Sequence, residues 1–181
     1  MAKELITSIG IDTSLTGTGV VVLENGKVTK QHLIKSKPSG DKPVEGVKRI
    51  QKIVEEIELI VGEFSPQIAV IEGLAFMARN TTALVQLSAL NYMTRAMLMN
   101  YHVPFVVIAP TSLKKFVTGN GAAKKDEMLL ATFKRYGVTI LNDNENDAYG
   151  LAQVGLALIG GNSKDINQKQ QEVLDLLKSQ L

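Results

Sequence analysis

Two hydrophobic patterns follow one another in the first part of the chain. Residues 5–11, 17–23 and 27–34 are apolar runs or alternate apolar with polar residues, which predicts three strands. Asn25-Gly26 is a hairpin-turn signal between the second and third runs, so these strands should pair antiparallel. From residue 44 to about 63 the apolar residues recur every three or four positions, which predicts a long helix.

Strands and helices alternate in the rest of the chain. Short apolar strands are predicted at 68–71 and 103–109, and a helix from residue 80 or 81 to 100 lies between them. This helix is apolar on more than one stripe, which indicates burial on two sides. Further helices are predicted at 110–117, 124–136 and 147–159, with a glycine loop at 118–123 and a polar lead-in at 142–146.

This order of elements defines a fold class. Three antiparallel strands followed by alternating strands and helices predict an α/β protein, with a mixed five-stranded sheet covered by helices on both faces. The ribonuclease H-like fold requires this order. We expect one domain over residues 1–161, followed by an amphipathic tail over 162–181 that could pack on the sheet, extend a dimer or fray.

The amino-acid composition argues against several kinds of site. The 181 residues are 45% apolar and 21% charged, which is typical of a globular domain. There is no cysteine, which excludes disulfides and thiolate metal sites, and two histidines do not favour a histidine-rich zinc site. No apolar run approaches the roughly 20 residues of a membrane span. We therefore expect a cytoplasmic protein with no membrane partner, and the net charge of +2 neither requires nor excludes a nucleic-acid partner.

Three carboxylates stand at unusual positions. Asp12 ends the first predicted strand, Glu72 ends the fourth, and Asp147 begins a helix that is otherwise apolar. The first and fourth strands can be parallel neighbours, which would place Asp12 and Glu72 side by side. Carboxylates in such proximity repel each other unless a cation neutralises them. Two Mg²⁺ ions about 3.5–4 Å apart are the usual arrangement for attack on a phosphodiester.

The last acidic cluster allows two interpretations. Asn144 and Asp147 share a helix face if the helix begins by residue 144, and both could then face a metal ion. Asp143 and Asn144 could instead be N-caps of that helix. Asp147 is followed by Ala-Tyr-Gly-Leu-Ala, and this apolar context favours a functional carboxylate.

Four motifs occur in order along the chain. They are IGIDTSLTGTGV at 9–20, IE at 71–72 with FMARN at 76–80, PTSLK at 110–114 with TGNGAAKK at 118–125, and NENDA at 144–148. Together they resemble the motifs of the RuvC family of Holliday junction resolvases, and the resemblance covers about residues 5–160. The NENDA form is more similar to phage-encoded members, which would act in the host cytoplasm.

The resemblance implies a homodimeric, Mg²⁺-dependent crossover junction endodeoxyribonuclease that makes paired nicks in four-way or branched DNA, with Mn²⁺ as a substitute metal. Residues 80–100 would form the dimer helix, and Phe76 would stack on an opened base. The implied catalytic residues are Asp12, Glu72, Asp147 and Lys125. The implied DNA-binding residues are Phe76, Arg79, Asn80, Lys114, Lys115, Lys124 and Lys125. The glycine loop would let backbone amides approach a phosphate.

The chain departs from the family pattern at two positions. The family's fourth acidic position falls on Asn144, so Asn144 is a neutral ligand, or Asp143 substitutes for it, or the second ion is held more weakly. The spacing from Glu72 to Phe76 is one residue longer than in bacterial members, which leaves core packing as the alternative role of Phe76.

Three other functions have to be weighed. An actin-like phosphotransferase shares the first motif but needs two lobes around a nucleotide, and 181 residues are too few, so no nucleotide cofactor is expected. Another ribonuclease H-fold nuclease would share the carboxylates but lack the TGNG and lysine stretch. A junction-binding module with a metal site impaired by Asn144 would bind DNA by charge and shape with weak or no cleavage.

Overall fold

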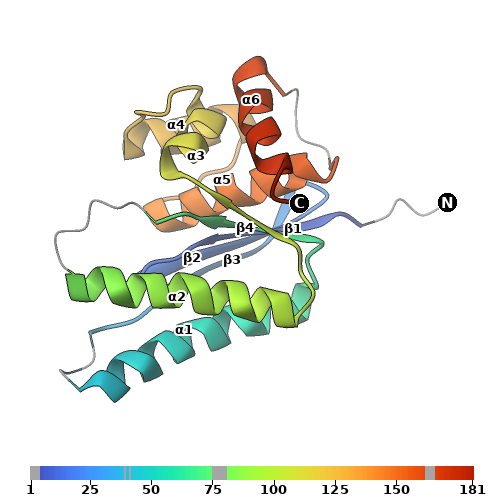
Figure 1. Ribbon diagram of the computed structural model, residues 1–181. Helices are drawn as coiled ribbons and strands as arrows, with labels where there is room; N and C mark the ends of the chain where they lie inside the picture. The colour runs from blue at the N-terminus through green and yellow to red at the C-terminus, as the bar shows by residue number, and fades with distance from the viewer. Residues whose placement is uncertain (1–4, 39, 41, 75–80, 162–165) are drawn as a thin grey trace.

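A five-stranded mixed sheet forms the centre of the molecule in the computed structural model, which describes residues 5–38, 40, 42–74, 81–161 and 166–181 (Figure 1). Its strand order is β3-β2-β1-β4-β5. The strands are β1 (Thr7–Asp12), β2 (Gly17–Glu24), β3 (Lys27–Lys35), β4 (Ile68–Glu72) and β5 (Phe105–Ile108). The first three pair antiparallel, and β4 and β5 run parallel to β1. The predicted α/β class and mixed sheet are confirmed.

Helices cover both faces of this sheet (Figure 1). On one face lie α1 (Pro43–Phe64) and α2 (Thr81–Asn100), which pack against each other. On the other face α5 (Asp143–Leu158) crosses β1, β2 and β4, and the shorter helices surround it. These are α3 (Pro110–Thr118), α4 (Lys125–Tyr136) and α6 (Gln168–Lys178). The long helix α5 is therefore the element that the sheet and the outer helices share.

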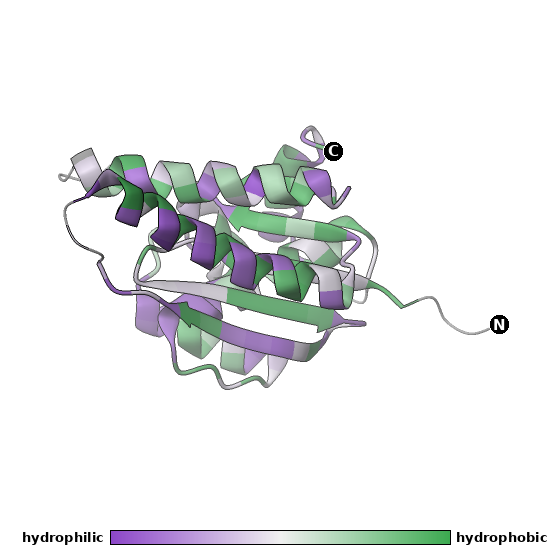
Figure 2. Ribbon diagram, turned by 90° about the horizontal axis from the view of Figure 1, so that it is seen from below, coloured by the Kyte–Doolittle hydropathy of each residue, from purple (hydrophilic) through white to green (hydrophobic). Residues whose placement is uncertain are grey.

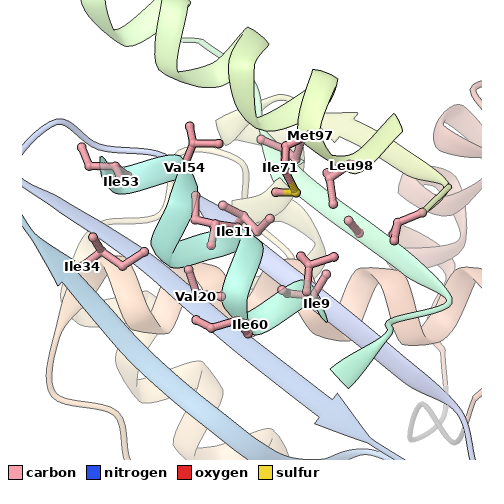
Figure 3. Close-up of a cluster of buried hydrophobic side chains, with 14 of the residues drawn as sticks. Ile9, Ile11, Val20, Ile34, Ile53, Val54, Ile60, Ile71, Met97 and Leu98 are labelled. Atoms are coloured by element: carbon pink, nitrogen blue, oxygen red, sulfur yellow. The ribbon is translucent and has the colours of Figure 1, made fainter. Parts of the chain in front are cut away.

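The core between the sheet and α1 follows from the helical spacing of apolar residues in α1. Ile50, Ile53, Ile57 and Ile60 are buried on one face of that helix. Figure 3 shows this cluster, in which side chains of α1 meet those of the sheet and of α2. The labelled residues are Ile9, Ile11, Val20, Ile34, Ile53, Val54, Ile60, Ile71, Met97 and Leu98.

The contact between the sheet and α5 depends on two glycines. A Cβ at Gly10 would overlap the backbone of Ala148 and Ala152, and a Cβ at Gly19 would overlap the backbone of Asn144. The backbones of β1 and β2 therefore lie directly against α5, with no side chain between them. This close approach brings the first turn of α5 to the carboxyl end of β1.

The C-terminal segment packs on the domain, which is one of the three arrangements that its amphipathic pattern allows. Val173, Leu174 and Leu177 of α6 are buried in a cluster with residues of β5, α3 and α5. Beyond α6, the side chain of Gln180 accepts a hydrogen bond from Val107 N at 2.8 Å and donates one to Val107 O at 3.0 Å. The predicted boundary at 161/162 adjoins residues 162–165, which lie outside the described residues, and it stays a prediction.

The structure corrects the start of α5. The helix begins at Asp143, four residues before the predicted start, because the side chain of Asn142 caps it by accepting from the amides of Asn144 and Glu145. Asn142, rather than Asp143 or Asn144, is therefore the N-cap. The first turn is polar and lacks the apolar periodicity that marks the rest of the helix, so the pattern alone misses it.

The two strands of the β2–β3 hairpin differ in polarity. Figure 2 shows β2 largely in the hydrophobic colour and the edge strand β3 largely in the hydrophilic colour. Every residue of β2 except Glu24 is buried, whereas β3 alternates between exposed and partly buried positions up to His32 and buries only Ile34. None of the helices that the structure describes combines the length and the apolar character needed to cross a bilayer.

Candidate active site

Two carboxylates meet where β1 and β4 end. The parallel register pairs Ile11 with Ile71, and the next residue on each strand is Asp12 on β1 and Glu72 on β4. The two side chains share a hydrogen bond. The sequence predicted this adjacency from the strand ends alone, and the register confirms it.

The third carboxylate reaches the same place from the helix layer. Asp147 lies in the first turns of α5, next to the strand ends, because Gly10 and Gly19 let the helix rest on the sheet. Its charge acts on both Asp12 and Glu72. The structure therefore brings together the three carboxylates that the sequence singled out.

Burial and the charges of nearby carboxylates raise the pKa of all three carboxyl groups. Burial first, and then the charges of Glu72 and Asp147, raise the pKa of Asp12 well above its ordinary value. Burial and the charge of Asp147 raise the pKa of Glu72 to about 7, although the Asp12 hydrogen bond and Lys114 act in the opposite direction. Burial and the charge of Asp143 raise the pKa of Asp147 to about 6. Strongly perturbed carboxyl groups in one cluster are typical of functional sites.

Two of the predicted lysines stand beside this cluster. Lys114, in α3, lowers the pKa of Glu72 and of Asp147 by its charge. Lys125, at the start of α4, has its Nζ 2.9 Å from the Oδ2 of Asp143. That hydrogen bond, with the charges of Asp143, Asp147 and Asp12, raises the pKa of Lys125, so the ammonium form is favoured.

The side chain of Asn144 makes a hydrogen bond to the backbone of β2. Its Nδ2 donates to the carbonyl of Gly17 at 2.6 Å, which ties the first turn of α5 to the start of β2. Asp143, one residue earlier, acts electrostatically on Asp147 and holds Lys125. Of the two residues considered for the fourth acidic position, Asp143 is the one that acts on the carboxylate cluster through its charge.

The remaining predicted DNA-binding residues have different surroundings. The Nζ of Lys115 lies 2.6 Å from the carboxylate of Glu172 in α6, so this lysine is engaged with the C-terminal helix rather than with the acidic cluster. Lys124 precedes α4 and is exposed, and its backbone N–H donates to Glu127. Phe76, Arg79 and Asn80 lie outside the described residues.

Backbone amides of the glycine loop donate within the loop and to the last turn of α3. The amides of Gly119, Asn120, Ala122 and Ala123 donate to Lys115 O, Thr118 Oγ1, Asn120 Oδ1 and Asn120 O respectively. These amides already have acceptors, so the expectation that the loop's backbone would approach a phosphate is not supported at these positions. Gly119 adopts φ = 82°, a left-handed conformation that ends α3 and favours glycine.

One polar residue next to the cluster was not predicted from the sequence. Asn91 lies in α2, fully buried, and its Nδ2 donates to Thr13 Oγ1 at 3.1 Å and to Glu72 O at 3.0 Å. The available signal was an amide on the core-facing side of an apolar helix. That signal could have drawn attention to Asn91, although it could not have named its partners.

A groove opens beside this end of the sheet, between the N-terminal halves of α1 and α2. It has a volume of about 970 Å³, and its lining includes Leu15, Lys42, Arg49 and Val85. Arg49 has a structural role in this groove, because its guanidinium donates hydrogen bonds to Leu15 O and to Ser36 Oγ. It thereby ties the turn after β1 to the end of β3.

The described residues contain no group of three or more His, Cys, Asp or Glu side chains placed closely enough to hold a metal ion. The donor set nevertheless has the chemistry of a hard-cation site. Asp12, Glu72 and Asp147 all have raised pKa values, the charge of at least one other carboxylate contributes to each of these shifts, and Asp12 and Glu72 share a hydrogen bond. Oxygen ligands of this kind are those that Mg²⁺ prefers, and a divalent cation would remove the repulsion.

A mixed sheet of this topology with acidic side chains at the ends of its central strands is the arrangement of ribonuclease H-like nucleases. The family model described as "Crossover junction endodeoxyribonuclease RuvC" matches residues 8–134. The chain belongs to this family.

Curated relatives and solved structures are similar to the chain. It is 31% identical over 156 residues to the RuvC protein of Prochlorococcus marinus, which covers 82% of this chain and 96% of the relative. It is 30% identical over 158 residues to that of Carboxydothermus hydrogenoformans, which covers 84% and 97%. A structure of Thermus thermophilus RuvC in complex with Holliday junction substrate matches with a TM-score of 0.71 and 19% identity, covering 86% of this chain and 97% of that one. The yeast mitochondrial resolvase Ydc2 matches with a TM-score of 0.50 and 12% identity, covering 95% and 81%. These two structures show the ribonuclease H-like fold.

Proposed function

We propose that the chain is a structure-selective endonuclease that resolves four-way or branched DNA by hydrolysing phosphodiester bonds. Membership of the crossover junction endodeoxyribonuclease family supports this reaction. The observation that carries it in this chain is the meeting of Asp12, Glu72 and Asp147 at the ends of β1 and β4. Such a cluster costs stability, which a purely structural role would not explain.

The reaction is proposed to depend on Mg²⁺, with Mn²⁺ as a substitute and two ions in each site. Asp12, Glu72 and Asp147 would hold the ions, and their raised pKa values favour this because a cation relieves the repulsion among them. When bound, the metal supplies the charge that activates water and stabilises the leaving oxygen of a phosphodiester. Asp12 is central to this set, since it interacts with both other carboxylates.

The two lysines beside the cluster are proposed to neutralise the scissile phosphate. Lys114 and Lys125 approach the carboxylates from α3 and α4, and both are ammonium donors that favour a phosphate. Asp143 orients Lys125 by their 2.9 Å ion pair. We assign Asp143 to the role of the family's fourth acidic position and Asn144 to holding α5 on β2. Lys115 and Lys124 are left as peripheral contacts to the DNA backbone, Phe76 as an aromatic that stacks on an opened base, and Arg79 and Asn80 as further DNA-binding residues.

The functional unit is proposed to be a homodimer formed through α2. Val85, Tyr92 and Met99 stand seven residues apart on this helix and are each about two-thirds exposed, at 67%, 64% and 65%. They form an apolar stripe on one face, while Leu90 and Leu98 on the opposite face are fully buried in the core. A second copy of the chain would cover the stripe, and paired nicking needs two sites.

The test is a cleavage assay with a matched pair of variants. The purified chain is incubated with a labelled four-way junction, a fork and a linear duplex, with Mg²⁺, with Mn²⁺ and with chelator. Paired symmetric nicks that occur only with metal and only in branched DNA are expected. Glu72→Gln should abolish nicking and retain junction binding, whereas Glu55→Gln, an exposed site on α1, should nick normally.

Two results would contradict the proposal. Nicking by Glu72→Gln at the wild-type rate would remove the carboxylate cluster as the catalytic centre. Junction binding by the wild-type chain without cleavage in either metal would favour the junction-binding module. Asn144 in place of a carboxylate would then account for the absence of cleavage.

A further inference from the structure

Asn91 is a buried amide inside an apolar core. The side chain is fully buried in α2, a helix whose residues Leu90 and Leu98 are also fully buried in the core. Its Nδ2 makes two hydrogen bonds, but its Oδ1 has no hydrogen-bond partner among the residues that the structure describes. A buried acceptor without a donor lowers stability, and an aliphatic side chain would avoid that cost. This cost in stability favours a functional role for the Asn91 side chain.

The two acceptors of Asn91 lie at the ends of the two strands that carry the paired carboxylates, one on the last residue of β4 and one on the residue directly after β1. One is the backbone carbonyl of Glu72 at 3.0 Å, and the other is the hydroxyl of Thr13, the residue after Asp12, at 3.1 Å. The ladder between β1 and β4 ends at the pair Ile11–Ile71. The amide of Asn91 therefore bridges the two strands just beyond the last register pair, where the sheet itself no longer fixes their separation.

We propose that Asn91 is a positioning residue that fixes the spacing between Asp12 and Glu72 for metal binding. The inference rests on the proposed function. It adds to that site a contact from α2, which lies on the face of the sheet opposite to α5 and Asp147. Asn91 acts through the backbone of Glu72 and through Thr13, and it does not touch the metal or the DNA. Groups that orient metal ligands in this way change metal affinity by about 10–100-fold when they are removed.

The measurement is Mn²⁺ binding to the full chain without DNA, followed by electron paramagnetic resonance of the free ion. Asn91→Leu removes both hydrogen bonds and keeps an apolar side chain of similar size. Thr94→Val is the matched control, because Thr94 is also fully buried in α2 and its hydroxyl donates within the helix, to Leu90 O. Thermal unfolding in chelator gives the stability of each variant separately.

We expect the dissociation constant for Mn²⁺ to rise about tenfold or more in Asn91→Leu and to stay within about twofold of wild type in Thr94→Val. Asn91→Leu should unfold within a few degrees of the wild-type chain in chelator. Thr13→Val provides a second route, since it removes one acceptor without touching α2. It should weaken Mn²⁺ binding, and Thr13→Ser, which keeps the hydroxyl, should restore it.

Failure of this inference is distinguishable from failure of the proposed function. If Glu72→Gln loses Mn²⁺ while Asn91→Leu and Thr13→Val bind it as wild type does, the positioning role is overturned and the metal site stands. Equal weakening by Asn91→Leu and Thr94→Val would assign Asn91 to general packing and also overturn the proposal. A wild-type chain that binds no Mn²⁺ would overturn both.

Discussion

Removing the charge of Glu72 should make the metal-free protein more stable while it destroys activity. Glu72→Gln keeps the shape of the side chain and its ability to hydrogen bond to Asp12, but it takes one negative charge from the cluster. Burial and the charge of Asp147 raise the pKa of Glu72 from 4.5 to about 7. The folded state therefore holds the proton more tightly than the unfolded state does, so the ionised form opposes folding.

The magnitude follows from that shift. About 1.4 kcal/mol for each unit of pKa gives an upper limit of about 3 kcal/mol at high pH. Because Glu72 shares a hydrogen bond with Asp12, part of the shift belongs to the pair, and we expect a gain of about 1–3 kcal/mol. For a chain of this size, that gain corresponds to a rise in Tm of about 2–12 °C.

The pH dependence gives the sign of the effect. Because folding raises the pKa of Glu72, its carboxyl group costs the wild-type chain no stability below its ordinary pKa of 4.5. The free energy of unfolding then falls as the pH rises through about 7. The variant should therefore match wild type near pH 4.5 and exceed it in Tm above pH 7. In Mg²⁺ the order should reverse, because binding to the folded state stabilises only a chain with an intact site.

The assay is thermal unfolding by circular dichroism in chelator and in Mg²⁺, at about pH 5 and about pH 8. Glu55→Gln is the control, because Glu55 is exposed on α1 and lies outside the carboxylate cluster, so its Tm should equal that of wild type at both pH values. A Glu72→Gln chain that unfolds at or below the wild-type Tm at the higher pH in chelator would refute the electrostatic reasoning.

Four further outcomes are expected. Gly10→Ala should prevent folding or lower Tm sharply, because its Cβ would overlap the backbone of α5, and circular dichroism of the purified variant checks this. Asn142→Ala should cost about 1 kcal/mol in urea unfolding, because it removes the cap of α5. Leu177→Ala should cost about 2–4 kcal/mol in the same measurement, because its side chain is 4% exposed in the cluster that holds α6. Nicking of a labelled junction at low Mg²⁺ should accelerate between about pH 6 and pH 8, as Glu72 and Asp147, with pKa values of about 7 and about 6, release protons that compete with the metal, and a flat profile would contradict this.

The pairing of Asp12 with Glu72 could be predicted because it depends only on strand ends. Each residue terminates an apolar run, and parallel neighbouring strands place their carboxyl ends at one edge of the sheet. Asp147 could be predicted as well, since a carboxylate directly before an apolar helical stretch is unusual. These signals are local, and the topology needed to combine them follows from the order of elements.

The surroundings of the site could not be predicted in the same way. Lys114 and Lys115 are neighbours in sequence, but consecutive helix positions point about 100° apart, and only the fold decides that one acts on the carboxylates while the other pairs with Glu172. The contact of Asn91 with Glu72 joins α2 to the end of β4 through a side chain, which no periodicity encodes. Contacts of this kind require the packed structure.

Both edges of the sheet are protected against pairing with another sheet. At the β5 edge, the amide of Gln180 accepts from and donates to Val107, as one residue of an added strand would. At the β3 edge, Lys27, Lys30 and Lys35 place positive charges along the strand. Open strand edges are templates for intermolecular β-pairing, and a capped edge and a charged edge each oppose it. Through Gln180, the residues beyond α6 thus oppose aggregation at the β5 edge of the sheet.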